Sequence, residues 1–434
     1  MRDLLVLSIV LVGCIAALKR PWIGIMLWTW ISIMNPHRYT YGIAYSAPLA
    51  LMAAVSVFIG LLMTKERDSP FKGSPVTMLV VFMVWMTISW LQGLDVSGDY
   101  EQWKKVMKID IMLIVGLMIL RSKQHIFALI WVCTGSIALL GIKGGAFTIL
   151  TGGSYRVWGP PGSFIGGNNE FALALVMTIP LLRFLQTQLR HRLWKLAMTS
   201  SMILCAAAAL GSQSRGALLA IAAMTATLWW RAKNKFVLGI GLALVAISLI
   251  AFMPDSWVNR MSTIQSYEED RSAMGRISAW WTAWNLALKY PAGVGFNPAT
   301  AEIFAKFSPY PDFVHAAHSI YFQIMGNHGF IGLFMFVLIW AMAWRMANRI
   351  RREKDLPANA QWTVELASMC QVSLAGFAVG GAFLSLSYFD LPYYIMVMVV
   401  LTRAWAERKA WLKEPAYQPG WKTIPGLAPS AKAV

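Results

Sequence analysis

Charged residues are scarce in this chain of 434 residues, where Asp, Glu, Lys and Arg together make up only 13%. A soluble domain contains roughly 25% charged residues, so a typical soluble protein is excluded. Hydrophobic residues make up 57% of the chain and form repeated runs of about 20 residues, the length of a membrane-spanning helix. No stretch alternates apolar and polar residues as a membrane-spanning strand does. The sequence therefore predicts an all-α polytopic membrane protein.

Cysteines are few, and nucleotide-binding motifs are missing. The sequence contains no P-loop and no GxGxxG motif. The single candidate for a metal-binding cluster is Glu268-Glu269-Asp270, and because it adjoins Arg271 we interpret it as a solvated loop. No metal or other cofactor is predicted. The four cysteines lie apart, without metal-ligand spacing, and are interpreted as packing residues: Cys14, Cys133, Cys205 and Cys370.

Acidic residues are outnumbered by basic ones, which gives a formal net charge of +18. Most basic residues lie in short links between apolar runs, and the positive-inside rule places such links in the cytoplasm. We therefore attribute the charge to membrane topology rather than to nucleic-acid binding. The links that carry the most basic residues lie at 65–72, 121–123, 183–195, 231–235, 345–354 and after Arg403.

Counting from these links gives about 12 transmembrane helices. The links at 35–42, 95–105, 143–169, 210–216, 254–319 and 385–387 then lie outside the cytoplasm. Whether the first 34 residues form two spans or one bent unit stays open, because Lys19-Arg20-Pro21 divides them. The candidate spans are 4–18, 22–34, 43–63, 75–94, 106–120, 126–142, 170–186, 193–209, 217–230, 236–253, 320–344, 364–384 and 388–403.

The chain divides into five parts on this reading. They are N-terminal spans (1–142), central spans (143–253), a large outer loop (254–319), C-terminal spans (320–403) and a cytoplasmic tail (404–434). We expect the segment 99–108 to be a surface helix that leads into the next span.

Three helices are expected to begin on the outer side, with Asn169, Ser214 and Ser319 as N-caps. Free N–H groups and the positive end of the helix dipole favour an anion at such a position. On the outer side of a membrane, that anion is most simply a lipid phosphate or diphosphate. Asn168 beside the first of these N-caps is included as a further candidate ligand.

Two arginines are candidates for binding this phosphate. Arg215 lies between strongly apolar segments near a membrane boundary, where an arginine is expensive unless it has a function. Arg276 begins a segment whose apolar residues recur with helical spacing and include three tryptophans, which predicts a helix on the membrane surface. Interfacial anchoring is the simpler alternative for both. Lys143 and Arg156, in the loop 143–169, are secondary candidates. The paired glycines at 144–145, 152–153 and in 159–162 predict turns.

His315 and His318 lie at the end of the large loop and are candidates for a general base. Histidine titrates near neutral pH and can take a proton from a hydroxyl group. Either residue can instead be structural. His328 lies about ten residues further along, roughly 15 Å deeper along a helix. We interpret it as a packing residue or as one that supports the site through a neighbouring side chain.

In chain order, these residues resemble the O-antigen ligase/polymerase family of bacterial inner-membrane proteins. The resemblance covers roughly residues 140–345, and the N-terminal Asn35-Pro36-His37-Arg38 resembles its O-glycosylation ligase branch. The matching motifs are Asn168-Asn169-Glu170-Phe171-Ala172, Ser214-Arg215-Gly216, Arg276 with Pro291-x-Gly293-x-Gly295, and His318-Ser319-x-Tyr321 followed by His328-Gly329.

The resemblance implies a GT-C-like fold and metal-independent transfer of a glycan from undecaprenyl diphosphate at the periplasmic face. The acceptor is a sugar hydroxyl of the lipid A core in ligases, another lipid-linked glycan in polymerases, or a protein. His318, or else His315, is expected to be the base, with Arg215 and Arg276 at the diphosphate. Ser319 stands where many members have Asn, and His328 where an acidic residue is common. These departures leave the acceptor and the exact base open.

Overall fold

The computed structural model describes residues 1–232, 234–251, 253–254 and 271–413. Within these ranges every regular element is a helix, which confirms the predicted all-α class. The α-helices are α1 (Arg2–Lys19), α2 (Pro21–Met34), α3 (Ile43–Ser46), α4 (Leu49–Met63), α5 (Ser74–Leu91), α6 (Val96–Ile119), α7 (Lys123–Leu150), α8 (Asn168–Gln188), α9 (Arg192–Gly211), α10 (Arg215–Arg231), α11 (Lys235–Ala251), α13 (Arg271–Lys289), α14 (Ala301–Phe307), α15 (Ile320–Arg351), α16 (Trp362–Gly380) and α17 (Asp390–Glu407). Short 3₁₀ helices are η1 (Pro36–Tyr39), η3 (Ala358–Ala360), η4 (Gly381–Phe383) and η5 (Ala410–Leu412).

Six of the described elements are long and apolar enough to cross a membrane, judged by length and composition. They are α5, α7, α8, α9, α15 and the run Ala358–Phe383, which contains α16. The helices α2 and α4 are apolar but shorter. A described helix covers most of every predicted span. The chain is thus a helical protein with several membrane-spanning candidates.

Three predicted boundaries were wrong. The expected span 43–63 is broken, because Pro48 lacks an N–H group and Ala47 before it is extended (ψ 141°). The expected surface helix 99–108 and the span after it form one continuous helix, α6. Helix α7 continues to Leu150, so Lys143 and Gly144-Gly145 lie in a helix rather than in a loop with a turn. A Cβ at Gly145 would overlap the carbonyl oxygen of Leu204, so the glycine lets α7 pack closely on α9.

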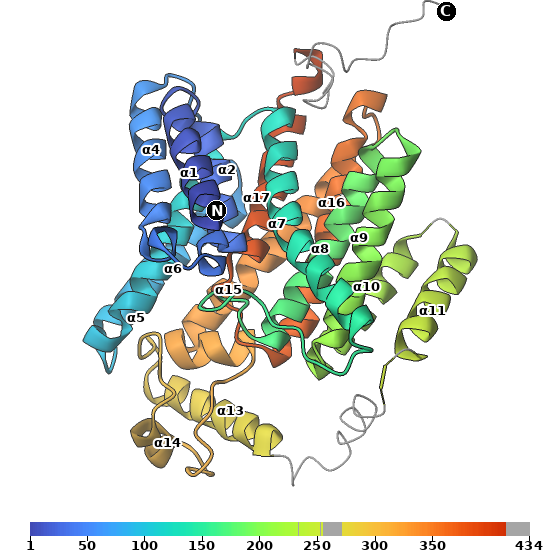
Figure 1. Ribbon diagram of the computed structural model, residues 1–434. Helices are drawn as coiled ribbons and strands as arrows, with labels where there is room; N and C mark the ends of the chain where they lie inside the picture. Colours follow the sequence, from blue (N-terminus) through green and yellow to red (C-terminus); the bar gives the residue numbers. More distant parts are fainter. Residues whose placement is uncertain (233, 252, 255–270, 414–434) are drawn as a thin grey trace, which may run out of the picture.

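The helices are arranged as a bundle with a cap at one end (Figure 1). Helices α7, α8 and α9 pack on one another and α16 packs on α8, while α1, α2 and α4 form a group at one edge. At the end of the bundle opposite the C-terminal end of α17, α13 and α14 lie across the bundle, and α13 packs on α15. The helix predicted to begin at Arg276 is therefore present within α13, although residues 255–270 of the same loop lie outside the described residues.

Helix α15 is broken at Gly329, which has a backbone conformation (φ 70°, ψ −175°) that interrupts the helix. A Cβ at Gly329 would overlap the carbonyl oxygen of Pro291, so only glycine admits the loop 291–296 into the break. The N–H groups of Val294 and Gly295 donate to the Asn327 carbonyl, at 2.8 and 3.2 Å. The break thus joins the motifs Pro291-x-Gly293-x-Gly295 and His328-Gly329.

The polar groups at this break are satisfied by a closed set of hydrogen bonds. The Asn327 amide donates to the Tyr388 hydroxyl (2.8 Å), which lies 2.7 Å from Nε2 of His328. Nδ1 of His328 lies 3.0 Å from Ser89 Oγ, which donates to the Asn327 carbonyl at 3.0 Å. Trp85 Nε1 donates to the carbonyl of His328 at 2.9 Å. If the neutral imidazole carries its proton on Nδ1, then Nδ1 donates to Ser89 Oγ and Nε2 accepts from the Tyr388 hydroxyl, so each hydrogen bond has one donor and one acceptor. His328 is fully buried, and both of its ring nitrogens lie within hydrogen-bond distance of a hydroxyl group.

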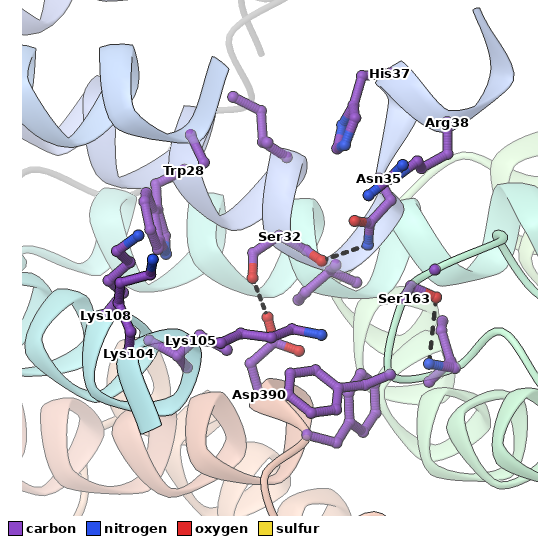
Figure 2. A pocket seen from close by; sticks show the side chains of 18 of the residues that line it. Trp28, Ser32, Asn35, His37, Arg38, Lys104, Lys105, Lys108, Ser163 and Asp390 are labelled. Atoms are coloured by element: carbon purple, nitrogen blue, oxygen red, sulfur yellow. Dashed lines mark hydrogen bonds between the residues drawn. The ribbon is translucent and has the colours of Figure 1, made fainter. Parts of the chain in front are cut away.

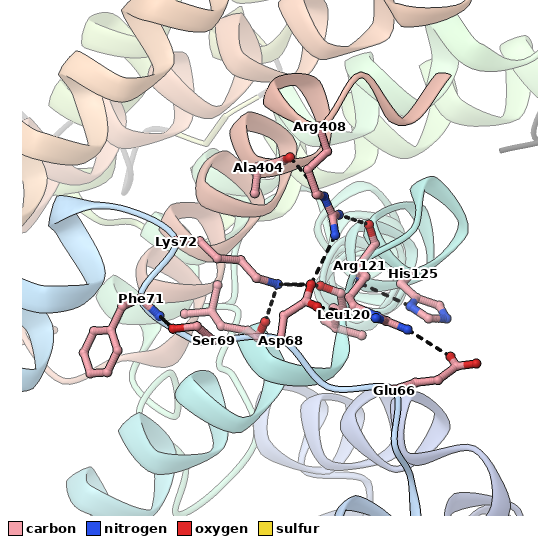
Figure 3. Close-up of polar contacts among 11 residues, drawn as sticks. Glu66, Asp68, Ser69, Phe71, Lys72, Leu120, Arg121, His125, Ala404 and Arg408 are labelled. Atoms are coloured by element: carbon pink, nitrogen blue, oxygen red, sulfur yellow. Dashed lines mark hydrogen bonds and ion pairs between the residues drawn. The ribbon is translucent and has the colours of Figure 1, made fainter. Parts of the chain in front are cut away.

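At the opposite end of the bundle, one carboxylate joins three links (Figure 3). Asp68 forms ion pairs with Lys72 (3.5 Å), Arg121 (3.4 Å) and Arg408 (3.1 Å). Arg121 also pairs with Glu66 at 3.0 Å, but the Glu66 side chain is 81% exposed, against 27% for Asp68. The sequence assigned all three links to the cytoplasmic side. This Asp68 cluster ties the end of α17 to the links after α4 and α6.

We expect Asp68→Asn to lower the free energy of unfolding by about 1–3 kcal/mol, because three cations lose their shared partner. Glu66→Gln is the matched control, and since Glu66 is exposed its effect should be close to zero. Thermal unfolding of the purified protein in detergent measures both. Equal transition temperatures for the two variants would show that Asp68 does not stabilise the fold.

Candidate active site

Three helices that carry candidate residues, α8, α10 and α15, begin at the same end of the bundle as α13 and α14 (Figure 1). Ser214 caps α10 by accepting a hydrogen bond from the Ala217 N–H (3.2 Å), and Ser319 caps α15 by accepting one from Phe322 (3.5 Å). Both N-caps were predicted. The prediction of Asn169 as an N-cap was wrong, because α8 begins at Asn168 and its N-cap is Gly167, which has no side chain to accept a hydrogen bond.

The start of α8 and the start of α10 are joined by polar contacts. The Asn168 amide donates to the carbonyl of Ser212 at 2.8 Å, and Arg156 Nε donates to Gln213 Oε1 at 3.3 Å. Asn168 and Arg156 therefore both lie beside the turn that precedes Arg215. Lys143 lies elsewhere on α7, with its Nζ 5.4 Å from the centre of the Tyr39 ring.

The segment 383–385 contacts both the start of α10 and the turn before α15. A Cβ at Gly216, which follows Arg215, would lie 3.5 Å from the Cβ of Phe383. The backbone N–H of His318 donates to Ser385 Oγ at 2.9 Å. The start of α10 and the turn before α15 thus pack on the same short segment.

Arg276, His315 and His318 form a group between α13 and α15, called the histidine group below. The His315 and His318 rings have centroids 4.8 Å apart. His315 packs on Gly275, where an added Cβ would lie 2.9 Å from Cδ2 of the ring. Arg276 is close enough to interact electrostatically with His318 and with Glu170 in the first turn of α8. Three segments far apart in the sequence therefore meet at this group.

The pKa of His318 is lowered to about 4, chiefly by burial and further by the repulsion of His315 and Arg276. The imidazole is consequently neutral at pH 7, and its Nδ1 is buried with no hydrogen-bond partner among the described residues. A neutral ring can accept a proton. An anion bound at Arg276 would offset the repulsion, raise the pKa of His318 and make it a stronger base.

Two residues beside these N-caps have left-handed backbone conformations. Gln213 has φ 56° and His318 has φ 42°, and neither is glycine. Such conformations cost free energy and occur most often where a site requires them. Each directly precedes the serine that caps α10 or α15. Sequence patterns gave no sign of this conformation.

The sequence also gave no reason to select Ser385 or Glu170. Ser385 lies in a link of three residues that was assigned only a topological role, and its contact with His318 spans 67 positions. Glu170 was quoted as part of a motif, but no charge partner for it could be read from the chain. Both were missed because their partners come from distant segments.

We expect the pKa of His318 to lie near 4 in the wild-type protein and to rise towards 6.5 in Arg276→Gln. Removing a nearby positive charge favours the protonated ring. Histidine-labelled NMR titration, assigned with His318→Ala, measures the value. Lys289→Gln, an exposed change at the end of the same helix, should leave it unaltered. A wild-type pKa near 6.5 would refute the described burial and repulsion.

Comparison with protein families adds independent information. Residues 200–337 match the family model described as O-antigen ligase. Residues 1–190 match a family of unknown function. No curated protein matches the chain.

The first match covers α10, α13 and the start of α15, and so contains Arg215, Arg276 and both loop histidines. It indicates an O-antigen ligase- or polymerase-type function, with glycosyltransferase-like activity on lipid-linked glycans. Through residues 200–337, this multi-helix membrane protein is similar to the O-antigen ligase family.

Proposed function

We propose that this protein is an O-antigen ligase with about 12 transmembrane helices in the bacterial inner membrane. It transfers a glycan from undecaprenyl diphosphate to a sugar hydroxyl of the lipid A core at the periplasmic face. The observation that carries the proposal is the group of Arg276, His315 and His318 within the family-matched region. It combines a neutral imidazole, which the acceptor hydroxyl requires as a base, with fixed positive charge, which the donor diphosphate requires.

In the proposed reaction His318 is the general base, with His315 as the second choice. The acceptor hydroxyl gives its proton to the neutral imidazole while its oxygen attacks the anomeric carbon of the donor sugar. The bond between that carbon and the diphosphate oxygen breaks with its electron pair, and undecaprenyl diphosphate leaves. This single displacement inverts the anomeric configuration.

Arg215 and Arg276 have the role of holding the diphosphate. A guanidinium keeps its charge and can bind two phosphate oxygens at once. Negative charge grows on the leaving diphosphate, so cations fixed near it stabilise the transition state more than the ground state. A diphosphate whose charge is neutralised is a good leaving group, and no general acid is required.

The starts of α8 and α10 supply further groups for the donor. Ser214 is the N-cap of α10, and the backbone N–H groups of the first turn of that helix lie at the same end as Arg215. Arg156 and Asn168 are held beside that turn by their contacts with Gln213 and Ser212. We assign these three residues to orienting the diphosphate and the first sugar.

Other functions would use the same donor site. A polymerase would extend another lipid-linked glycan, and product length on a gel distinguishes it from a ligase. A protein O-oligosaccharyltransferase would label a polypeptide. A transporter would move the lipid-linked glycan across vesicles without any acceptor. Supplying undecaprenyl-diphosphate glycan together with each candidate acceptor identifies the product.

We expect Arg215→Ala, Arg276→Ala and His318→Ala each to reduce transfer by about 10²–10⁴-fold, because each removes transition-state charge stabilisation or the base. Gel analysis of the glycolipid product in reconstituted membranes measures this. Arg67→Ala, an exposed arginine in another link, is the control for charge loss. Transfer by purified His318→Ala at the wild-type rate, tested beside His315→Ala, would eliminate His318 as the base.

Transfer should be unchanged after treatment with EDTA, because the proposed chemistry uses only protein cations. The candidate carboxylates Glu268-Glu269-Asp270 lie outside the described residues. Activity that is lost to EDTA and restored by Mg²⁺ or Mn²⁺ would instead assign a metal to this acidic run.

A further inference from the structure

A cavity of about 460 Å³ has a lining that includes neither His315 nor His318. It is formed by α2, η1, α6, the loop 162–165 and the start of α17 (Figure 2). Its volume is within the roughly 300–1,000 Å³ that is usual for ligand pockets. Most of its lining comes from the links at 35–42, 95–105 and 143–169, which the sequence assigned to the same outer side. All but two of its lining residues fall within the region that matches a family of unknown function.

The cavity carries an excess of positive charge. Four basic side chains and two carboxylates line it, which leaves a formal excess of two positive charges. One of these carboxylates, Glu101, already pairs with Lys104 at 2.5 Å. Asp390 is buried and accepts a hydrogen bond from Ser32 at 2.5 Å. The remaining basic residues are Arg38, Lys105 and Lys108.

The fold brings like charges together in this cavity. Lys105 on α6 is repelled electrostatically by Arg38 on η1, although Asp390 attracts it. Nε of Arg38 and Nδ1 of His37 are buried atoms with no hydrogen-bond partner among the described residues. Burial and Arg38 together lower the pKa of His37, which favours the neutral ring. Placing cations close together and leaving buried donors unsatisfied both cost free energy, and a bound oxyanion would offset both costs.

The other walls of the cavity suit a sugar ring. Trp28, Phe164 and Phe389 provide aromatic surface, and Lys105 Nζ lies 3.8 Å from the centre of the Phe164 ring. Ser32, Asn35 and Asp390 provide hydrogen-bonding groups for hydroxyls (Figure 2). A mainly apolar pocket with a few placed polar groups is the usual form of a small-molecule site. A free phosphate ion would leave the aromatic walls unused.

We propose that this cavity binds an anionic sugar, one that carries a phosphate or a carboxylate, with Arg38 and Lys105 at the anionic group and the aromatic residues against the ring. The binding itself is independent of the transfer reaction. That the sugar belongs to one of the two glycolipid substrates rests on the proposed function. The N-terminal region would then select substrates for a reaction that occurs at the histidine group.

The first test measures binding to the full-length protein in nanodiscs by isothermal titration calorimetry. The probes are glucose 6-phosphate, glucuronic acid, glucose and inorganic phosphate. We expect saturable binding of the two anionic sugars, at least ten-fold tighter than that of glucose or phosphate. If neither anionic sugar shows saturable binding, the proposal is overturned. A preference for inorganic phosphate over both sugars would overturn the sugar assignment and reduce the cavity to a simple anion site.

Lys105→Met and Arg38→Gln should each weaken binding of the anionic sugars at least ten-fold. Lys289→Met makes the same kind of charge change at an exposed position in the outer loop and should leave binding unchanged. Lys105→Arg keeps the charge and should retain binding within about three-fold, a comparison that separates loss of charge from misfolding. Unchanged affinity in both Lys105→Met and Arg38→Gln would overturn the assignment of the anion.

Competition kinetics then identify the source of the sugar. If the cavity holds the acceptor, glucose 6-phosphate will compete with the acceptor and not with the donor, and the reverse pattern assigns it to the donor. His318→Ala should abolish transfer while probe binding persists. Binding without transfer in the wild-type protein would refute the proposed function alone, and transfer without binding would refute the cavity's role alone.

Discussion

The fold depends on satisfying the backbone carbonyls that become free where α15 is broken. A carbonyl that is buried away from water without a partner costs several kcal/mol. Here the Asn327 carbonyl accepts two N–H groups from the loop 291–296 and the hydroxyl of Ser89. The carbonyl of His328 accepts from Trp85. The break is therefore a fixed joint between α5, α15 and the loop that follows α13.

This joint has a direct bearing on the candidate site. The loop 291–296 leads directly from α13, the helix that carries Arg276, so seating that loop in the break fixes the end of α13 against α15. Asp99 at the start of α6 reinforces the seat by accepting from the Phe296 N–H at 2.5 Å. His318 is held separately, by its bond to Ser385 and by the Ser319 cap. Two independent attachments thus set the separation between the cationic arginine and the neutral imidazole.

Much of the helical architecture could be predicted because apolar runs, proline positions and capping serines act locally. Ser214 and Ser319 were recognised as N-caps from a few neighbouring residues, and the helix containing Arg276 from its spacing of tryptophans. The break at Gly329 could not be predicted, because it requires Pro291 and Asn327 to meet across the fold. Ser385 and the cavity between α2, η1, α6 and α17 could not be predicted for the same reason. The cavity residues Arg38, Lys105 and Asp390 lie far apart in the sequence. Asn169 was misassigned because glycine at 167 already ends the preceding loop.

The break also sets a length. Helix α15 contains 32 residues, which as a straight rod would measure roughly 48 Å, well beyond a hydrocarbon core of about 30 Å. The part after Gly329 measures roughly 33 Å and matches that thickness by itself. A straight helix of this size would have to tilt with each change in bilayer thickness, and would carry both of its ends with it. Because α5 and the loop 291–296 hold the helix at the break, the nine residues before Gly329 stay fixed against the rest of the protein. The position of His318 is then set by protein contacts rather than by the membrane.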